Sequence, residues 1–481
     1  MNPLNPSFDG HRSPPRSSVQ AQAGHLYELR LSSDASLALA RGWLWLGLLA
    51  LIVSGLFAVV LVLARTPGLN QVLPLADLFR VALVVHVDLS VLVWFTAMAG
   101  LLWSLNSSAA GRRTGWAAWG LCALGTALMC VAPFADPGTP LMANYIPVID
   151  GPVFLTGLVL FGVGTTLLVL RSLWAALPPG LRLDGAAALR FGLNASVVAT
   201  AVALLAFVAS FVLTPASLSG KPYYEILFWG GGHALQFTWT LLMLVGWLWL
   251  AGACGVRVPL SPRLALLMFA LALVSVFVTP YAYLAHDIAS VEHRNLHTWA
   301  MRIGGGLAIA PVTLAVGWGL MRARAQPLQP NQQPLRVALL SSMLLFAVGG
   351  IIGVLINGNN VRIPAHYHGS IVGVTLALMG LVYHLLPQLG WRAPAGRLAV
   401  WQPALYGVGQ LMHIVGLVWS GGYGVQRKVA GSEQVLRSAA EVAGMGLMGL
   451  GGLIAIIGGM LFVVVVLRAM RAPAVRAAPH S

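Results

Sequence analysis

Histidines within strongly apolar stretches are the residues of this sequence best suited to bind a redox metal. A carboxylate accompanies them, and the set comprises His86, His233, His286, Asp287, His366 and His368. An ionisable side chain inside a bilayer is costly and usually marks a functional site. A single such histidine could be structural, but this set comes from four separate stretches and therefore indicates metal ligands.

The spacing of these residues divides them between sites. His366 and His368 are two residues apart, so on a helix they point about 200° apart and cannot chelate one ion. They suit two cofactors on opposite sides of the helix, and haem is the natural candidate because imidazole is a standard axial ligand. His286 and Asp287 are adjacent, and His233 could complete with them a three-ligand metal site with an open position.

The elements that must position these residues are membrane-spanning helices. The chain is 58% hydrophobic and only 9% charged, whereas soluble domains carry about 25% charged residues. A spanning helix needs about 20 mostly apolar residues. Twelve runs qualify, at about 43–64, 79–104, 115–134, 151–172, 189–214, 223–252, 263–287, 299–321, 336–357, 363–388, 401–422 and 440–467. The sequence predicts an all-α polytopic domain over 41–470, with polar tails at 1–40 and 471–481.

The distribution of basic residues predicts the orientation. With twelve spans both tails lie on one side, and that side holds roughly two thirds of the lysines and arginines. Both termini are therefore expected in the cytoplasm, with the histidines toward the outer ends of their helices. The net charge of +15 comes from scattered residues. It does not form a basic stripe interleaved with aromatic residues, so nucleic acid is not an expected partner.

Several motifs resemble the catalytic subunit I of the haem–copper oxidase superfamily, which includes cytochrome oxidases and nitric oxide reductases. They are His86-Val-Asp-Leu-Ser in the second span, Trp229-Gly-Gly-Gly-His233 in the sixth, and Ala365-His366-Tyr367-His368 in the tenth. The resemblance implies a twelve-helix bundle with two haems, here expected to be b-type, and one nonhaem metal, copper or iron. It assigns His86 and His368 to a low-spin haem, His366 to a high-spin haem, and His233 to the nonhaem metal.

The end of the seventh span departs from the family, which usually has two adjacent histidines there. The sequence reads His286-Asp287 at the corresponding distance from Ala310-Pro311. A two-histidine, one-aspartate site resembles a divergent nitric-oxide-reductase-like branch, and its carboxylate favours iron over copper. His293 and His297 are rival ligands, but they are expected to be loop histidines near the haem edge.

A second departure concerns tyrosine. Family members that split dioxygen carry a tyrosine linked to the sixth-span histidine, one turn after it, where this chain has Phe237. In another form the tyrosine comes from the seventh span, but Tyr281 and Tyr283 are out of register by one or two residues. These departures favour nitric oxide reduction, although residues 226–245 lack the glutamates of the better-known nitric oxide reductases.

The resemblance also suggests which residues bind the haem propionates and where the electrons come from. Arg427 and Lys428, in the last outer loop, resemble a basic pair that binds haem propionates. His384 and His413 are expected to be structural. The sequence has no Cys-x-x-Cys-His motif for a cytochrome domain. Electrons are therefore expected from quinol or from a partner subunit with a cupredoxin-like or cytochrome c domain on the outer face. The location implied is a bacterial inner membrane, with the active site toward the periplasm.

Three alternatives remain at this stage. The first is a terminal cytochrome c or quinol oxidase that reduces dioxygen. The second is a dihaem electron carrier or sensor without a nonhaem metal. The third is a twelve-helix transporter, although transporter sites lie near the midplane and these histidines lie toward one face. Few proton-carrying side chains occur in the inner half, so proton pumping is expected to be weak or absent.

Overall fold

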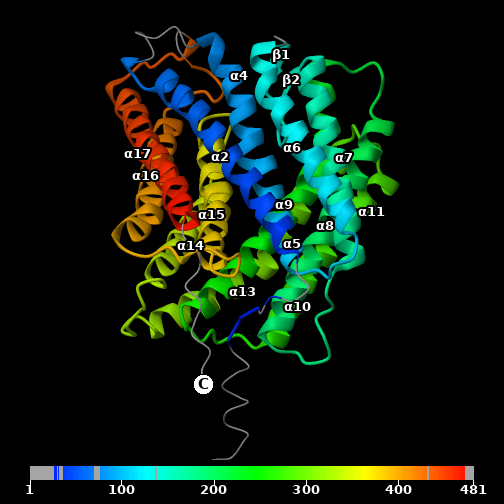
Figure 1. The fold of residues 1–481 in the computed structure, drawn as a ribbon. Coiled ribbons are helices and arrows are strands. Elements are labelled where there is room, and N and C mark those ends of the chain that lie inside the picture. Colours follow the sequence, from blue (N-terminus) through cyan, green and yellow to red (C-terminus); the bar gives the residue numbers. More distant parts are fainter. Residues whose placement is uncertain are drawn as a thin grey trace, which may run out of the picture.

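Long helices running roughly side by side make up the molecule (Figure 1). The computed structural model describes residues 26–29, 31, 36–69, 76–135, 138–430 and 433–471. Within these residues, eleven helical segments are long and apolar enough to cross a membrane. They are α2 (Leu37–Arg65), Leu78–Leu105, α6 (Arg112–Ala135), α7 (Pro152–Ala175), α8 (Gly185–Leu213), α9 (Gly220–Ala253), Pro262–Ala285, Val291–Arg322, α14 (Gln333–Val354), α15 (Arg362–Leu385) and α17 (Ala439–Met470). The predicted all-α membrane bundle is confirmed.

Three of these segments are composite. Their parts are α4 (Ala76–Val87), η1 (Asp88–Val93) and α5 (Trp94–Leu105); α10 (Pro262–Val276) and α11 (Val278–Ala285); and α12 (Val291–Ala300), η2 (Met301–Gly305) and α13 (Gly306–Arg322). The predicted span at 401–422 corresponds to α16 (Arg397–Gly422), which is long enough to cross but less apolar, because Gln402, Gln410 and His413 interrupt it.

The helices that carry the candidate ligands form the interior of the bundle. In the most apolar window of α9, 94% of the residues are buried, against 78% for α15 and 61% for Leu78–Leu105. The other spans are buried over 28–44% of the corresponding window. Interior helices contact protein rather than lipid, so they can carry polar side chains at lower cost. This explains why His86, His233, His366 and His368 lie on these three segments.

Two π-helical segments directly follow histidines of interest. η1 begins two residues after His86, and η2 begins four residues after His297. Single π turns inside α-helices are rare and occur frequently at functional sites. Each deviation therefore marks the helix around one of these histidines as a candidate functional segment.

A short hairpin closes the outer end between α6 and α7. Strands β1 (Thr139–Leu141) and β2 (Val148–Asp150) pair antiparallel, with Thr139 opposite Asp150. Figure 1 shows the hairpin at the top, near the start of α4. Tyr145 in the connecting loop has a φ of 68°, in the left-handed region that is uncommon for residues other than glycine. The sequence reading did not predict this hairpin.

Part of the predicted N-terminal tail belongs to the packed structure. Tyr27 is fully buried, and its hydroxyl donates a 2.7 Å hydrogen bond to the carbonyl of Leu260. The boundary at residue 40 is also late, because α2 begins at Leu37. Most of the predicted tail 1–40, and 472–481 of the predicted C-terminal tail, lie outside the described residues.

Candidate haem and metal sites

Six histidines present their rings in the same way, with Nδ1 near an oxygen atom. The partners are Ser54 O for His86 (3.0 Å), Trp229 O for His233 (2.8 Å), His293 O for His297 (2.8 Å), Gly349 O for His366 (2.7 Å), Gln410 Oε1 for His368 (3.2 Å) and Met448 O for His413 (2.9 Å). A carbonyl oxygen only accepts, so Nδ1 carries the proton and Nε2 keeps a lone pair. Metal-bound histidines are typically oriented by such a bond on the other nitrogen.

The two histidines of the tenth span face different neighbours, as their spacing predicts. His366 Nδ1 reaches Gly349 on α14, where a Cβ on Gly353 would lie 2.7 Å from the same nitrogen. His368 reaches Gln410 on α16. The arrangement is therefore compatible with one imidazole for each of two haems.

His86 and His368 belong to one cluster. They lie within electrostatic reach of each other, His86 on α4 and His368 on α15. His413 on α16 joins them, with its ring centroid 4.5 Å from that of His368. No described residue hydrogen-bonds Nε2 of any of the three. His413, which we expected to be structural, is thus a third imidazole in this pocket.

The rings that lie beside His233 belong to His293 and His297. The ring centroids of His233 and His297 are 5.7 Å apart, and those of His293 and His297 are 4.6 Å apart. His293 and His297 are each only 1% exposed, and His233 is 5% exposed. Among the described residues, neither ring nitrogen of His293 has a hydrogen-bond partner, nor does Nε2 of His297. Buried nitrogens without partners are costly, which fits a group that binds there.

His286 and Asp287, the predicted partners of His233, have no described contact with its ring, although both lie within electrostatic reach of His293. Helix α11 ends at Ala285, His286 is extended, and the Asp287 side chain is exposed and accepts a 2.8 Å bond from the amide of Ala289. These two residues stay predicted ligands, but the structure brings His297 beside His233 instead, because the next helix begins at Val291 rather than near 299. The Ser290 side chain caps it by accepting from the His293 amide.

The early start of α12 changes the role of its histidines. His293 and His297 are four residues apart and so share one helical face, a spacing that commonly places two histidines on one metal. Loop histidines were expected at these positions. The i, i+4 spacing was visible in the sequence and could have identified the pair.

The histidine cluster fits a nonhaem metal in its chemistry, although its nitrogens do not converge. Within the described ranges, no group of three His, Cys, Asp or Glu side chains is arranged to hold an ion. Three buried imidazoles, two of which have ring nitrogens without a partner among the described residues, are nevertheless a suitable donor set for copper, iron or zinc.

Two tyrosines adjoin the cluster. The Tyr145 hydroxyl lies 2.9 Å from His233 Nε2, and since Nδ1 holds the proton, the hydroxyl donates. The Tyr283 ring packs 4.8 Å from that of His293, and its hydroxyl bonds Ser210 at 2.6 Å. The sequence argument considered tyrosine only at Phe237 and in the seventh span, and it did not predict that two tyrosines lie beside these histidines. Tyr145 arrives from an outer loop, and α11 turns Tyr283 inward.

The three glycines before His233 make this packing possible. A Cβ on Gly230 would lie 2.3 Å from the Tyr283 hydroxyl, and one on Gly232 would lie 2.3 Å from Cγ of Tyr145. A Cβ on Gly231 would meet the Phe207 ring at 2.4 Å. Each glycine thus admits one aromatic ring against α9, and the ring of Tyr145 lies against His233 itself.

Basic side chains line the outer end. Arg427 donates to Asn359 Oδ1 at 2.7 Å, and the Lys428 ammonium donates to the carbonyl of Met142 at 2.6 Å. Burial, with Arg427 and Lys221 nearby, lowers the pKa of Lys428 to about 8. Arg362 also lies here, and its buried Nε has no partner. An unpaired buried guanidinium nitrogen fits an anion such as a haem propionate, so Arg362 joins the predicted pair as a candidate.

Comparison with known proteins agrees with the resemblance to an oxidase subunit I. The family model described as "Cytochrome C and Quinol oxidase polypeptide I" matches residues 38–461. An uncharacterised protein of Rickettsia prowazekii, RP382, is 29% identical, and the alignment covers 89% of this chain and 94% of that protein. An uncharacterised protein of Aquifex aeolicus is also 29% identical, over 74% of this chain and 86% of its own length.

A solved structure shares the fold. It is described as a haem–copper terminal oxidase dimer, and it matches with a TM-score of 0.68 and 17% sequence identity over 92% of this chain and 86% of that chain. At that identity the likeness concerns the fold alone. The family match spans almost every helix and includes all the histidines discussed above, so the chain belongs to the cytochrome c and quinol oxidase polypeptide I family, the subunit I of the haem–copper oxidase superfamily.

Proposed function

We propose that the chain is the catalytic subunit of a respiratory oxidoreductase that reduces a diatomic gas between a high-spin haem and a nonhaem metal. The observation that carries this is the buried cluster of His233, His293 and His297. Within the described residues, both ring nitrogens of His293 and Nε2 of His297 have no hydrogen-bond partner. His366 would hold the high-spin haem, and His86 and His368 the low-spin haem that feeds it. These groups would supply the electron transfer and gas-binding chemistry.

Dioxygen is the substrate that the geometry supports best. The nonhaem ligands proposed here are three neutral imidazoles, without the carboxylate that favoured nitric oxide. Splitting the O–O bond needs an additional electron and proton in one step, and a phenol beside the site can provide both. Tyr145 and Tyr283 lie there, and burial raises the pKa of Tyr145 well above its ordinary value, so its phenol keeps the proton.

Nitric oxide reduction is the second candidate. Phe237, one helical turn after His233, is buried and has no hydroxyl. Coupling two nitric oxide molecules to nitrous oxide takes two electrons and two protons, which two metals and a second haem can supply without a tyrosine. Phe237 is the feature that favours this reaction, and the metal would then be iron or copper on the same three histidines.

Residues around the cluster would orient the histidine rings, exclude water and hold the haem propionates. The carbonyls of Trp229 and His293 hold the rings of His233 and His297 in one tautomer. Such outer partners are typically worth 10–100-fold in metal affinity or activity. The buried position of the cluster excludes water, which strengthens electrostatic interactions inside the site. Arg427, Lys428 and Arg362 would hold the propionates.

The charge distribution supports an orientation of the subunit in the membrane. We place both termini in the cytoplasm of a bacterial inner membrane and the active site toward the periplasm. Electrons would come from quinol or from a partner subunit with a cupredoxin-like or cytochrome c domain on the outer face.

Gas consumption by the purified protein tests this proposal. Reduced protein is supplied separately with dioxygen and with nitric oxide, and haem and metal are quantified in the same sample. The expected result is two haems, one further copper or iron, and faster consumption of dioxygen. Faster consumption of nitric oxide would select the second candidate. Protein with two haems and no gas consumption would indicate an electron carrier instead.

A further inference from the structure

The contact between Tyr145 and His233 joins a surface hairpin to the metal-binding face of the interior. The two side chains meet at 2.9 Å between the hydroxyl and Nε2, with ring centroids 4.8 Å apart. Because the carbonyl of Trp229 occupies Nδ1, Nε2 is the nitrogen that offers a lone pair to a metal. The Tyr145 hydroxyl therefore occupies the coordination position of His233.

The hairpin is built to hold Tyr145 there. Its backbone is in the left-handed region, which is unfavourable for a residue other than glycine and persists only where surrounding structure enforces it. Gly232 leaves the space for the ring, and Trp229 packs edge-on at 5.9 Å.

Three hydrogen bonds, two with α9 and one with the loop after α16, fix the hairpin over the site. Asn144 donates to Glu225 at 2.8 Å, and Tyr224 donates to Asp150 at 2.8 Å. Lys428, from the loop after α16, donates to a carbonyl within the hairpin at 2.6 Å. The hairpin is thus tied both to the helix of His233 and to the basic loop at the outer end.

We propose that Tyr145 is a positioning residue that caps His233 Nε2 until the nonhaem metal enters, so that metal loading and hairpin position are linked. This rests on the proposed function, because it takes His233 to be a ligand of that metal. The hydroxyl and the metal compete for one lone pair, so metal entry must break the Tyr145 bond. Removing the hydroxyl then favours metal binding.

Metal titration of the full-length, metal-depleted protein tests the cap. Cu(I), and in parallel Fe(II), is titrated into wild type, Tyr145→Phe and Tyr283→Phe, and bound metal is measured. Tyr145→Phe keeps the ring in its place and is expected to bind about fivefold more tightly, since one hydrogen bond of roughly 1 kcal/mol no longer opposes binding. Tyr283→Phe is the matched control, because its hydroxyl bonds Ser210, and its affinity should match wild type.

The outcomes separate the cap from the function. Equal or weaker binding by Tyr145→Phe, with wild type binding normally, overturns the cap alone. Wild type that binds neither metal overturns the nonhaem site and the cap together. Amide exchange over 139–150 gives a second measurement, which should quicken when wild type takes up metal, and an unchanged rate would also overturn the link.

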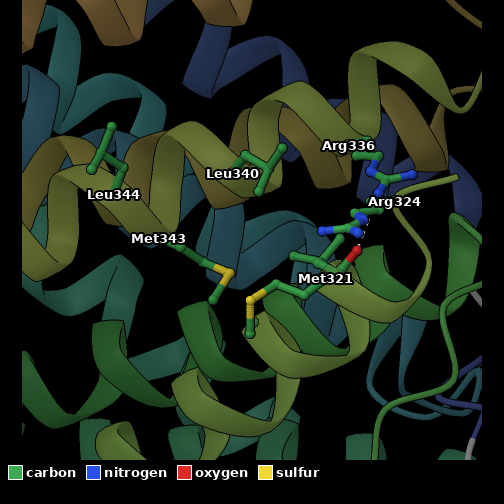
Figure 2. A pocket seen from close by; sticks show the side chains of 8 residues that line it. Met321, Arg324, Arg336, Leu340, Met343 and Leu344 are labelled. Carbon is green, nitrogen blue, oxygen red and sulfur yellow. Dashed lines mark hydrogen bonds between the residues drawn. The ribbon is translucent and has the colours of Figure 1, made fainter.

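A groove on the outside of the bundle carries a second, independent inference. It lies between α13 and α14, with a volume of about 520 Å³ (Figure 2). Met321, Leu340 and Leu344 are each about half exposed along it, as expected of a surface that faces lipid chains. Arg324 and Arg336 lie together at one end, as Figure 2 shows.

The two arginines are not equivalent. Arg336 donates to the carbonyls of Leu320 and Ala323 at 3.2 Å each, and so closes the C-terminal end of α13. Arg324 is exposed, and no described residue pairs with its guanidinium. An apolar channel that ends at a free arginine complements an amphiphile with a negative head. The positive-inside rule places this end in the cytoplasmic leaflet.

We propose that the groove binds an anionic phospholipid, with its phosphate at Arg324 and an acyl chain along the methionines and leucines. Basic pockets between helices on that side commonly bind such head groups. The test measures the thermal midpoint of wild type, Arg324→Gln and Arg397→Gln in dioleoyl phosphatidylglycerol or dioleoyl phosphatidylcholine. Arg397 is exposed at the start of α16 and away from the groove, so it serves as the control.

Phosphatidylglycerol is expected to raise the midpoint of wild type and Arg397→Gln more than phosphatidylcholine does, with the difference lost in Arg324→Gln. Equal midpoints in the two lipids would overturn the proposal, as would an undiminished difference in Arg324→Gln. If a neutral quinone analogue raised the midpoint of wild type as much as phosphatidylglycerol does, charge would not select the occupant of the groove. That result would also overturn the proposal.

Discussion

His293 and His297 lie one turn apart on the same face of α12, with their ring centroids 4.6 Å apart and both side chains buried. The carbonyl of His293 holds Nδ1 of His297, so one residue orients the other as well as lying beside it. Two of the three candidate ligands of the nonhaem metal therefore lie on the eighth span rather than at the end of the seventh. The third is His233.

His297→Ala should remove the nonhaem metal and leave both haems. Losing a ligand is expected to cost more than the roughly 10–100-fold in affinity that follows loss of an outer partner. The measurement is metal content beside haem content in purified protein. Asp287→Ala is the control, because its exposed carboxylate only caps a turn, and it should retain the metal. Loss of metal in Asp287→Ala with retention in His297→Ala would restore the ligand set expected from the sequence.

Separate substitutions of His366 and His368 should remove different haems. His368→Ala is expected to lose the low-spin haem and His366→Ala the high-spin haem, as the two face α16 and α14 respectively. Optical spectra of the reduced proteins distinguish the two species, and His384→Ala should keep both. His413→Ala is decisive for the low-spin site, because its ring lies beside His368. Loss of that haem in His413→Ala alone would transfer the ligand role to His413.

The sequence predicted the helices and the interior histidines because both depend on local properties. Apolar runs determine where helices span, and the spacing of His366 and His368 determines that they face apart. These features do not depend on contacts with distant parts of the chain, so they could be deduced from the residues alone.

Two parts of the site did not follow from the apolar runs, although the spacing of His293 and His297 was a local signal for the first. The position of His293 depends on the turn at Asp287–Ser290, where a serine cap starts a helix eight residues before the apolar run. Tyr145 depends on a hairpin held by residues that are distant in sequence, among them Lys428, 286 positions from its partner. Hydropathy does not reveal such contacts. The tyrosines known from the family lie in the sixth and seventh spans, so the resemblance does not point to Tyr145 either.

Gly232→Ala should destabilise the outer end of the bundle. The added Cβ would lie 2.3 Å from Cγ of Tyr145, so the ring or the hairpin must move. Overpacking of this kind typically costs about 1–3 kcal/mol. Thermal unfolding gives the measurement, and Gly162→Ala is the control, because nothing lies within 4 Å of its added Cβ. If the two substitutions proved equally mild, the close packing of Tyr145 on α9 would be contradicted.

Lys428 should make stability depend on pH in the alkaline range. Burial, then Arg427 and Lys221, lower its pKa to about 8, while Glu225 opposes the shift. Between pH 8 and its ordinary pKa near 10.5, the folded protein has released this proton and the unfolded chain still holds it. The unfolded state then binds more protons, so this group's contribution to stability rises with pH. The unfolding free energy of wild type should therefore increase relative to Lys428→Met from pH 7.5 to pH 10, because over that range the unfolded chain holds one proton that the folded protein has released. A constant difference would mean that Lys428 keeps its charge throughout, as a bound propionate beside it would cause.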